Sequence, residues 1–90
     1  MTREKQSPVK DTKSLEEELK ELVLFNDDVN SFDFVIESLI EVCEHDSEQA
    51  EQCALVAHFK GKCAVKSGSF YELKPAYTEM TNRKLTVSIE

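Results

Sequence analysis

The sequence predicts a small α+β domain, in which a three-stranded antiparallel sheet has three helices packed on one face in the order β-α-α-β-α-β. Two observations lead to this prediction. Three short apolar runs have the length and the bounding polar residues of strands. The segments between them space their apolar residues three or four apart, as amphipathic helices do. A chain of 90 residues has room for one domain, and the strands are expected at residues 21–25, 62–66 and 84–90.

Residues 1–20 precede the first strand and are predicted to be a disordered tail. They hold five basic and five acidic side chains and no sustained apolar face, although "SLEEELK" is compatible with a short helix. The folded domain is therefore expected at residues 21–90. The start of the chain has no apolar region of a secretory signal, and no apolar run reaches 18 residues, so we expect a cytoplasmic protein without a membrane span.

The first strand, "ELVLF", ends at "NDD", three consecutive oxygen-bearing side chains that indicate a turn. A helix is predicted to start at Phe32, with Asn30 or Ser31 as its N-cap. "EHD" closes this helix. Its apolar face follows helical spacing and consists of Phe32, Val35, Ile36, Leu39, Ile40 and Cys43.

A second helix is predicted to run to about Lys60, with Asp46 or Ser47 as its N-cap. Gly61 suits the left-handed position that follows many helices. The second strand, "KCAVK", comes directly afterwards. One face of the helix carries Ala50, Cys53, Ala54, Ala57 and His58.

The third helix is predicted to begin with a capping box formed by Ser69 and Glu72. Pro75 lies inside its apolar pattern, so we expect a kink or an early break there. The last segment, "KLTVSIE", alternates apolar and polar residues, which is typical of a half-buried strand. The residues expected to face inward from the third helix are Phe70, Leu73, Tyr77 and Met80.

Charge is distributed unevenly along the chain. The formal net charge is −7, and residues 21–51 carry ten acidic side chains without a lysine or arginine, whereas residues 52–90 carry six basic and three acidic side chains. Such an acidic stretch repels phosphate backbones, so we do not expect a nucleic-acid partner. It would attract a cation instead, such as a metal ion, a basic surface or an amine.

The three cysteines, Cys43, Cys53 and Cys63, stand ten residues apart, a spacing that matches no zinc-binding pattern. Their number is odd, and no two of them form a Cys-x-x-Cys pair. We interpret them as small buried side chains in a reducing compartment.

The candidate binding residues are Asn26, Asp27 and His58. An αα-hairpin returns the end of the second helix toward the start of the first, so these three side chains are expected to ring one opening. They offer three acceptors, and an ammonium has three N–H donors and no acceptor. With an apolar cavity below, the arrangement suits the N-terminal residue of a peptide. The expected walls of this cavity are Phe32, Val35, Ala54 and Ala57.

The segment "LVLFNDDVNSFDFVIESL", followed by "LVAHFKGK", resembles the ClpS family, the adaptors that hand N-degron substrates to a Clp-type AAA+ unfoldase and its protease. The resemblance covers roughly Leu22 to Lys66 and resumes at the last strand. Its parts are the Asn-Asp-Asp run after an apolar strand, the Phe-Val pair one turn into the helix, and His-x-x-Gly-Lys. Each part alone is a weak signal, and the three together are specific.

The resemblance implies that Asn26, Asp27 and His58 hold the α-amino group of the substrate and that Asp28 shapes the loop. The implied partners are an unfoldase of the ClpA or ClpC class and peptides that begin with Leu, Phe, Tyr or Trp. We expect a monomer that is not an enzyme and needs no cofactor. The implied lining of the hydrophobic pocket is Asn30, Phe32, Val35, Ala54, Ala57 and Leu85.

The chain departs from the family pattern at several positions. Phe32 stands where a methionine is common, Ala54 stands where a methionine is frequent, and residues 29–31 replace an aromatic-Thr-Pro run. The segment from Val65 to Lys84 is shorter than is typical. The changes at Phe32 and Ala54 predict a pocket that is wider at its base and takes Trp and Phe at least as well as Leu.

Two other functions remain as alternatives. A metal-dependent enzyme would use Asp27, Asp28 and His58, although no further His or Glu stands at ligand spacing. An interaction domain of the same fold, like the C-terminal domain of the ribosomal stalk protein, would have no peptide pocket. Each feature also has a purely structural interpretation, namely a turn and cap for Asn-Asp-Asp, a core histidine for His58 and a core anchor for Phe32.

Overall fold

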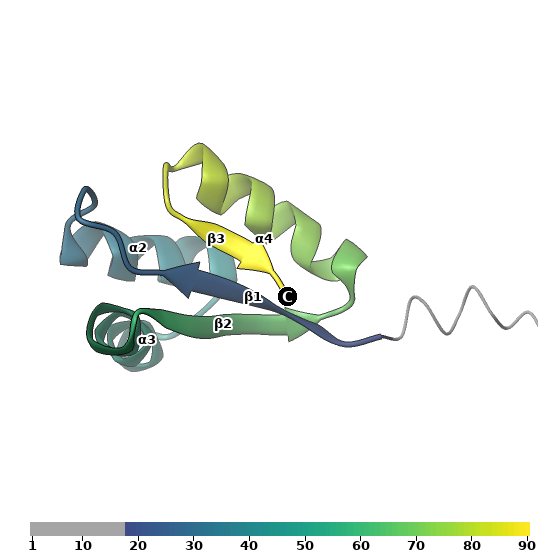
Figure 1. Ribbon diagram of the computed structural model, residues 1–90, viewed down its shortest axis with the longest axis horizontal. Helices are drawn as coiled ribbons and strands as arrows, with labels where there is room; N and C mark the ends of the chain where they lie inside the picture. Colours follow the sequence, from purple (N-terminus) through teal and green to yellow (C-terminus); the bar gives the residue numbers. More distant parts are fainter. Residues whose placement is uncertain (1–17) are drawn as a thin grey trace, which may run out of the picture.

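The computed structural model describes residues 18–90. Residues 1–17 of the predicted tail 1–20 lie outside the described residues. The element order confirms the predicted α+β fold (Figure 1). The strands and helices are β1 (Lys20–Phe25), α2 (Phe32–Cys43), α3 (Ser47–Lys60), β2 (Lys62–Gly68), α4 (Phe70–Asn82) and β3 (Val87–Ile89). β1 begins one residue earlier than expected, because Lys20 pairs with Gly68.

The sheet has the strand order β2-β1-β3, and both pairings are antiparallel. Figure 1 shows β1 between the other two strands, with β2 emerging directly from the end of α3. Leu22 and Leu24 of β1 are buried in the same cluster as Leu39 of α2 and Leu73 of α4. Because alternate side chains of a strand point to one face, these contacts place the helices on a single face of the sheet, as predicted.

The first two helices begin and end as their local sequences predict. Ser31 caps α2 by accepting a hydrogen bond from the Phe34 amide at 3.1 Å, and Asp46 caps α3 by accepting from the Gln49 amide at 2.7 Å. Gly61 ends α3 with φ of 97°, a left-handed conformation that favours glycine. These caps fix the start of α2, the start of α3 and the end of α3.

Helix α4 has the predicted capping box, in which the Glu72 amide donates to Ser69 Oγ and the Ser69 amide donates to Glu72 Oε1. The expected early break at Pro75 is wrong, since the helix continues to Asn82. Proline removes one amide donor, and the Tyr71 carbonyl that loses it belongs to an exposed residue. The inward face also differs from the prediction, because Ala76 is buried and Phe70 is exposed.

The last strand is shorter than the expected 84–90. Lys84 has φ of 70°, and Leu85 is buried in the core before the strand begins. Backbone pairing nevertheless spans most of the segment, because the Phe25 amide donates to the Thr86 carbonyl at 2.9 Å and Glu21 exchanges two hydrogen bonds of 2.8 Å with Glu90. β3 therefore forms one outer edge of the sheet, and its pairing holds β1 up to Phe25.

The three cysteines are free thiols, and only Cys43 is fully buried. Burial, opposed in part by Lys66 and reinforced by Glu44, raises the pKa of the Cys43 thiol to about 11. Cys53 and Cys63 are half-buried against the core. The interpretation as small packing side chains therefore holds fully for Cys43 and in part for the other two.

The turn between α2 and α3 is anchored by a residue that the sequence did not single out. His45 is buried, and its Nε2–H donates to the Val65 carbonyl of β2 at 2.7 Å. This bond fixes the αα-hairpin against the sheet. None of the helices within residues 18–90 has the length and apolar character needed to cross a membrane.

Candidate functional site

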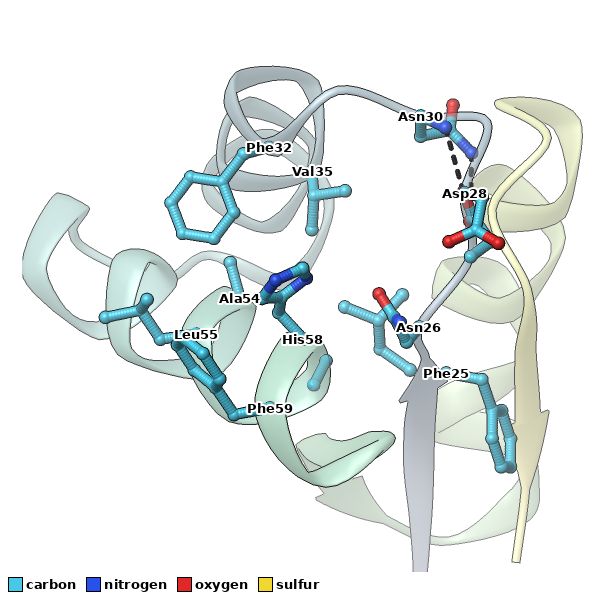
Figure 2. A pocket seen from close by; sticks show the side chains of 13 residues that line it. Phe25, Asn26, Asp28, Asn30, Phe32, Val35, Ala54, Leu55, His58 and Phe59 are labelled. Atoms are coloured by element: carbon cyan, nitrogen blue, oxygen red, sulfur yellow. Dashed lines mark hydrogen bonds between the residues drawn. The ribbon is translucent and has the colours of Figure 1, made fainter.

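A cavity of about 520 Å³ opens between the end of β1, the start of α2 and the second half of α3 (Figure 2). This volume lies within the usual range of small-ligand pockets. The lining residues are Leu24, Phe25, Asn26, Asp27, Asp28, Asn30, Phe32, Val35, Ala54, Leu55, Ala57, His58 and Phe59.

The loop on one side of the opening is held by the Asp27 carboxylate. Asp27 Oδ1 accepts hydrogen bonds from the Val29 amide at 2.9 Å and the Asn30 amide at 2.8 Å, and Oδ2 accepts from Asn30 Nδ2 at 3.1 Å. Burial acts to raise the pKa of Asp27, but the hydrogen bonds from Asn30 and Val29 outweigh it and lower the pKa below its usual value. Asp27 is therefore an anion in a loop of fixed shape.

The resemblance implied that Asp27 holds the α-amino group and that Asp28 shapes the loop. The loop-shaping role was expected for Asp28, whereas the hydrogen bonds that shape the loop go to Asp27. Asp28 lines the cavity with an exposed side chain. A carboxylate can accept about four hydrogen bonds, and Asp27 uses three of these positions, so it retains one for a ligand.

Asn26 is fixed beside the end of α3 through its backbone. The Asn26 amide donates to the Gly61 carbonyl at 2.9 Å, and the Gly61 amide donates to the Ala57 carbonyl at 2.9 Å. The turn after α3 thus brings Asn26 and His58 to one side of the opening. An added Cβ on Gly61 would meet no atom within 4 Å, so the positive φ and not space is what requires glycine.

His58 projects from the last turns of α3 into the opening, where Figure 2 shows its ring between Asn26 and the α2 residues Phe32 and Val35. Its ring meets the Phe59 ring edge-on, with the centroids 4.9 Å apart and an interplanar angle of 77°. Within residues 18–90, neither the His58 ring nor the Asn26 side chain has a hydrogen-bond partner. Their polar atoms are therefore open to a ligand.

The walls of the cavity are apolar and come from two helices. Phe32 and Val35 lie on α2, and Ala54 faces them from α3 (Figure 2). Ala57 of α3 also lines the cavity. Both alanines are buried, and their small side chains leave space between the helices. The cavity therefore combines an apolar interior with a polar, acidic mouth.

Nine of the ten predicted site residues line this one cavity, and Leu85 is the exception. Leu85 is 4% exposed and packs in the hydrophobic core, because the chain turns inward at this residue before β3. The prediction also missed four lining residues, which are Leu24, Phe25, Leu55 and Phe59. Leu55 and Phe59 stand four residues apart on α3, and this helical spacing is the signal that could have revealed them.

Among residues 18–90, no three His, Cys, Asp or Glu side chains are grouped so that they could hold a metal ion. Asp27, Asp28 and His58 share the opening without forming such a group.

Comparisons with known proteins agree on one family. Residues 16–88 match the family model described as ATP-dependent Clp protease adaptor protein ClpS. The ATP-dependent Clp protease adapter protein ClpS of Oleidesulfovibrio alaskensis is 42% identical over 69 residues, which cover 69% of this chain and 66% of that protein. The protein of the same name from Campylobacter jejuni subsp. jejuni is 37% identical over 57 residues, which cover 63% of this chain and 59% of that protein. The chain thus spans less than two thirds of the length of these relatives.

A solved structure has a similar fold. It is Agrobacterium tumefaciens ClpS2 bound to L-phenylalaninamide, with a TM-score of 0.70 over 82% of this chain and 96% of that chain. The sequence identity is 21%, so this likeness concerns the fold alone.

Proposed function

Since this chain belongs to the ClpS family of Clp protease adaptors, we propose that it binds N-degron substrates by their free α-amino group and their large hydrophobic first side chain. The observation that carries the proposal is the pairing of open polar atoms on Asn26 and His58 with an apolar cavity directly beside them. Peptides that begin with Leu, Phe, Tyr or Trp combine the two matching groups.

The chemistry of the opening fits an ammonium. Asn26 Oδ1, an unprotonated nitrogen of His58 and the remaining acceptor position of Asp27 can each accept one of the three N–H groups. The negative charge of Asp27 favours the protonated amine. The ClpS2 structure of similar fold holds L-phenylalaninamide, a phenylalanine derivative with a free α-amino group, which supports the same assignment here.

The test compares peptides that differ only at the amine. Acetylation removes the positive charge and two of the three N–H donors, and each hydrogen bond to a charged group contributes about 1.5 to 3 kcal/mol. Affinity measured by fluorescence anisotropy should therefore fall by at least about a hundredfold. His58→Ala should have a similar effect without unfolding the domain, since His58 is exposed. Equal affinity for free and acetylated peptides would falsify the proposal and favour an interaction domain that does not recognise the amine.

The second part of the proposed function is delivery to an unfoldase of the ClpA or ClpC class. The resemblance implies that the N-terminal segment engages the unfoldase during hand-over. Lys20 pairs with Gly68 in the sheet, so the suitable deletion removes residues 1–17 and leaves β1 intact. This deletion should keep the peptide affinity and abolish the accelerated degradation of an N-degron reporter by the cognate protease. Unchanged degradation would mean that the folded domain alone performs the transfer.

A further inference from the structure

Two of the three free thiols lie together between α3 and β2. Cys63 of β2 pairs with Leu24 of β1, and opposite residues of an antiparallel pair project their side chains to the same face of the sheet. Leu24 is buried in the core between the sheet and the helices, so Cys63 also points toward the helices. Cys53 of α3 packs against the same core. The fold therefore brings the two cysteines to one place from two different elements.

The Cys53 and Cys63 side chains are in direct contact. The Cys63 thiol donates to the Ala64 carbonyl at 3.5 Å. A second hydrogen bond joins Cys53 to Cys63, and Cys53 is its donor because the proton of Cys63 is already directed to Ala64. Burial and this hydrogen bond raise the pKa of the Cys53 thiol to about 12. Cys53 is therefore a protonated thiol whose S–H points at the sulfur of Cys63.

The third thiol, Cys43, has a different environment. It is buried at the end of α2, whereas Cys53 and Cys63 are half-buried. Within residues 18–90, no hydrogen bond joins the Cys43 side chain to either of the other two. A small oxidant in water can therefore reach the pair more easily than it can reach Cys43.

We propose that Cys53 and Cys63 form a reversible disulfide bond in the folded protein when a peroxide is present, and that this bond fastens α3 to β2. Two cysteines can be bridged without backbone movement only if their side chains point toward each other, as these two do. The inference goes beyond the proposed function, because it does not depend on what the cavity binds.

The oxidation takes two steps, with hydrogen peroxide as the oxidant. The thiolate sulfur of Cys63 attacks one peroxide oxygen, the O–O bond breaks, and a sulfenic acid and water are formed. The sulfur of Cys53 then attacks the sulfenic sulfur, the S–O bond breaks, and the hydroxide leaves as water with the Cys53 proton. Two thiols are oxidised by two electrons in total, and one peroxide is reduced to two waters. Cys63 reacts first, because the raised pKa of Cys53 keeps that thiol protonated.

The bond would stabilise the domain without reshaping the cavity. It closes a loop that runs from Cys53 through His58 and the turn at Gly61 to Cys63, and such a loop restricts the unfolded chain. The folded chain changes little, since the two side chains already touch. For a closed loop of about ten residues, we expect the Tm to rise by about 10–20 °C.

The experiment compares the full chain after treatment with hydrogen peroxide and after reduction with dithiothreitol. Intact mass should show the loss of two hydrogen atoms, and peptide mapping should find the link between Cys53 and Cys63. The Tm should be higher in the oxidised sample and return to its first value after reduction. The affinity for a peptide that begins with Phe should be the same in both samples.

Three single variants assign the effect to this pair. Cys53→Ala and Cys63→Ala should each lose the link and the difference in Tm between the oxidised and the reduced samples. The matched control is Cys43→Ala, which should keep both, although its Tm falls in both samples because a buried side chain is shortened. Peptide mapping of the wild-type chain needs none of these variants, so it tests the proposal even if one of them does not fold.

Each other result overturns the proposal. These results are a link between Cys43 and Cys53, a link between two chains, and a sulfinic acid at Cys63 without a bridge. A bridged form with a lower Tm or a weaker affinity than the reduced form would mean that the bond distorts the fold. If neither form binds the peptide, the proposed function is wrong, and the mass and Tm measurements still decide on the disulfide.

Discussion

Asn30 joins the loop after β1 to Lys84, although 54 positions separate the two residues. Its Nδ2 donates to the Lys84 carbonyl at 3.0 Å and also to Asp27 Oδ2 at 3.1 Å. Lys84 has a left-handed conformation with φ of 70° and lies shortly before β3. The loop that carries Asp27 is therefore held by a hydrogen bond within the loop and by a second one to the segment before β3.

Asn30→Ala removes both of these hydrogen bonds and should loosen the loop. Each such bond contributes a net of about 0.5–1.5 kcal/mol, so the loss of both should lower the unfolding free energy by about 1–3 kcal/mol. Peptide affinity should fall about tenfold, because Asp27 loses one of its three hydrogen bonds and the loop loses its bond to Lys84. The control is Val29→Ala, which keeps the backbone bond to Asp27 and changes a side chain that is 87% exposed. Unchanged affinity in Asn30→Ala would mean that the amine site does not depend on this loop.

Peptide binding should weaken as the pH rises above about 8, because the α-amino group of a peptide has a pKa near 8 and must be protonated. At low pH, the protonation of Asp27 sets the limit below which the loop is no longer stabilised. Its pKa is depressed below 3.8 in the folded state, so the stability that its ionised form provides is present above the unfolded pKa and is lost as the pH falls through the folded value. The loop should therefore keep its shape down to pH values below 3.8.

A pH series with free and acetylated peptides checks both statements. The acetylated peptide should bind weakly from pH 7 to about 9 without a downward trend, since it has no amine to titrate. If the free peptide kept its full affinity at pH 9 and above, recognition of a protonated amine would be excluded.

Ala54→Met should narrow the base of the pocket. Ala54 is buried in the wall, and a larger side chain there has to occupy the space between α2 and α3. We expect the affinity for peptides that begin with Trp or Phe to fall about tenfold relative to Leu. Ala64→Met on the exposed side of β2 is the control. If the preference among Leu, Phe and Trp did not change, Ala54 would not be in contact with the first side chain.

Pro75→Ala should stabilise the domain. A proline inside a helix costs up to about 3 kcal/mol relative to alanine, and alanine would return an amide donor for the Tyr71 carbonyl. Each 1 kcal/mol shifts the Tm of a domain of this size by about 4–8 °C. Thr78→Ala, also exposed on α4, measures the gain from helix propensity alone. A Tm for Pro75→Ala that is no higher than for Thr78→Ala would show that α4 already accommodates the proline without cost.

Features that depend on neighbouring residues could be predicted from the sequence. The caps Ser31, Asp46 and Ser69 each bond to an amide three residues later, and a left-handed glycine at Gly61 ends α3. Such signals need only a few neighbouring positions of the chain, so both ends of α2 and α3 and the start of α4 were predicted correctly. The nine shared lining residues followed because the hairpin geometry and the family motif point to the same opening.

The missed features depend on residues that are distant in the sequence. Leu85 was assigned to the pocket through the family resemblance, whereas it lies in the core directly after the left-handed residue Lys84. Phe59 lies off the alanine face of α3, and only its spacing of four residues from Leu55 connects it with the cavity. Pro75 was expected to kink the third helix or to break it early, but the helix continues to Asn82, and Leu73, Ala76 and Met80 pack in the core on both sides of the proline.

β2 and β3 form the two outer edges of the sheet, and neither edge is a good template for another strand. β3 has only three residues. On β2, Lys62 and Lys66 add charge, and the pairing with β1 skips Val65, which interrupts its regularity. Short strands, lysines and irregular pairing are known ways of preventing edge-to-edge association. These features therefore disfavour the addition of a further strand, such as an extended peptide, at either edge of the sheet.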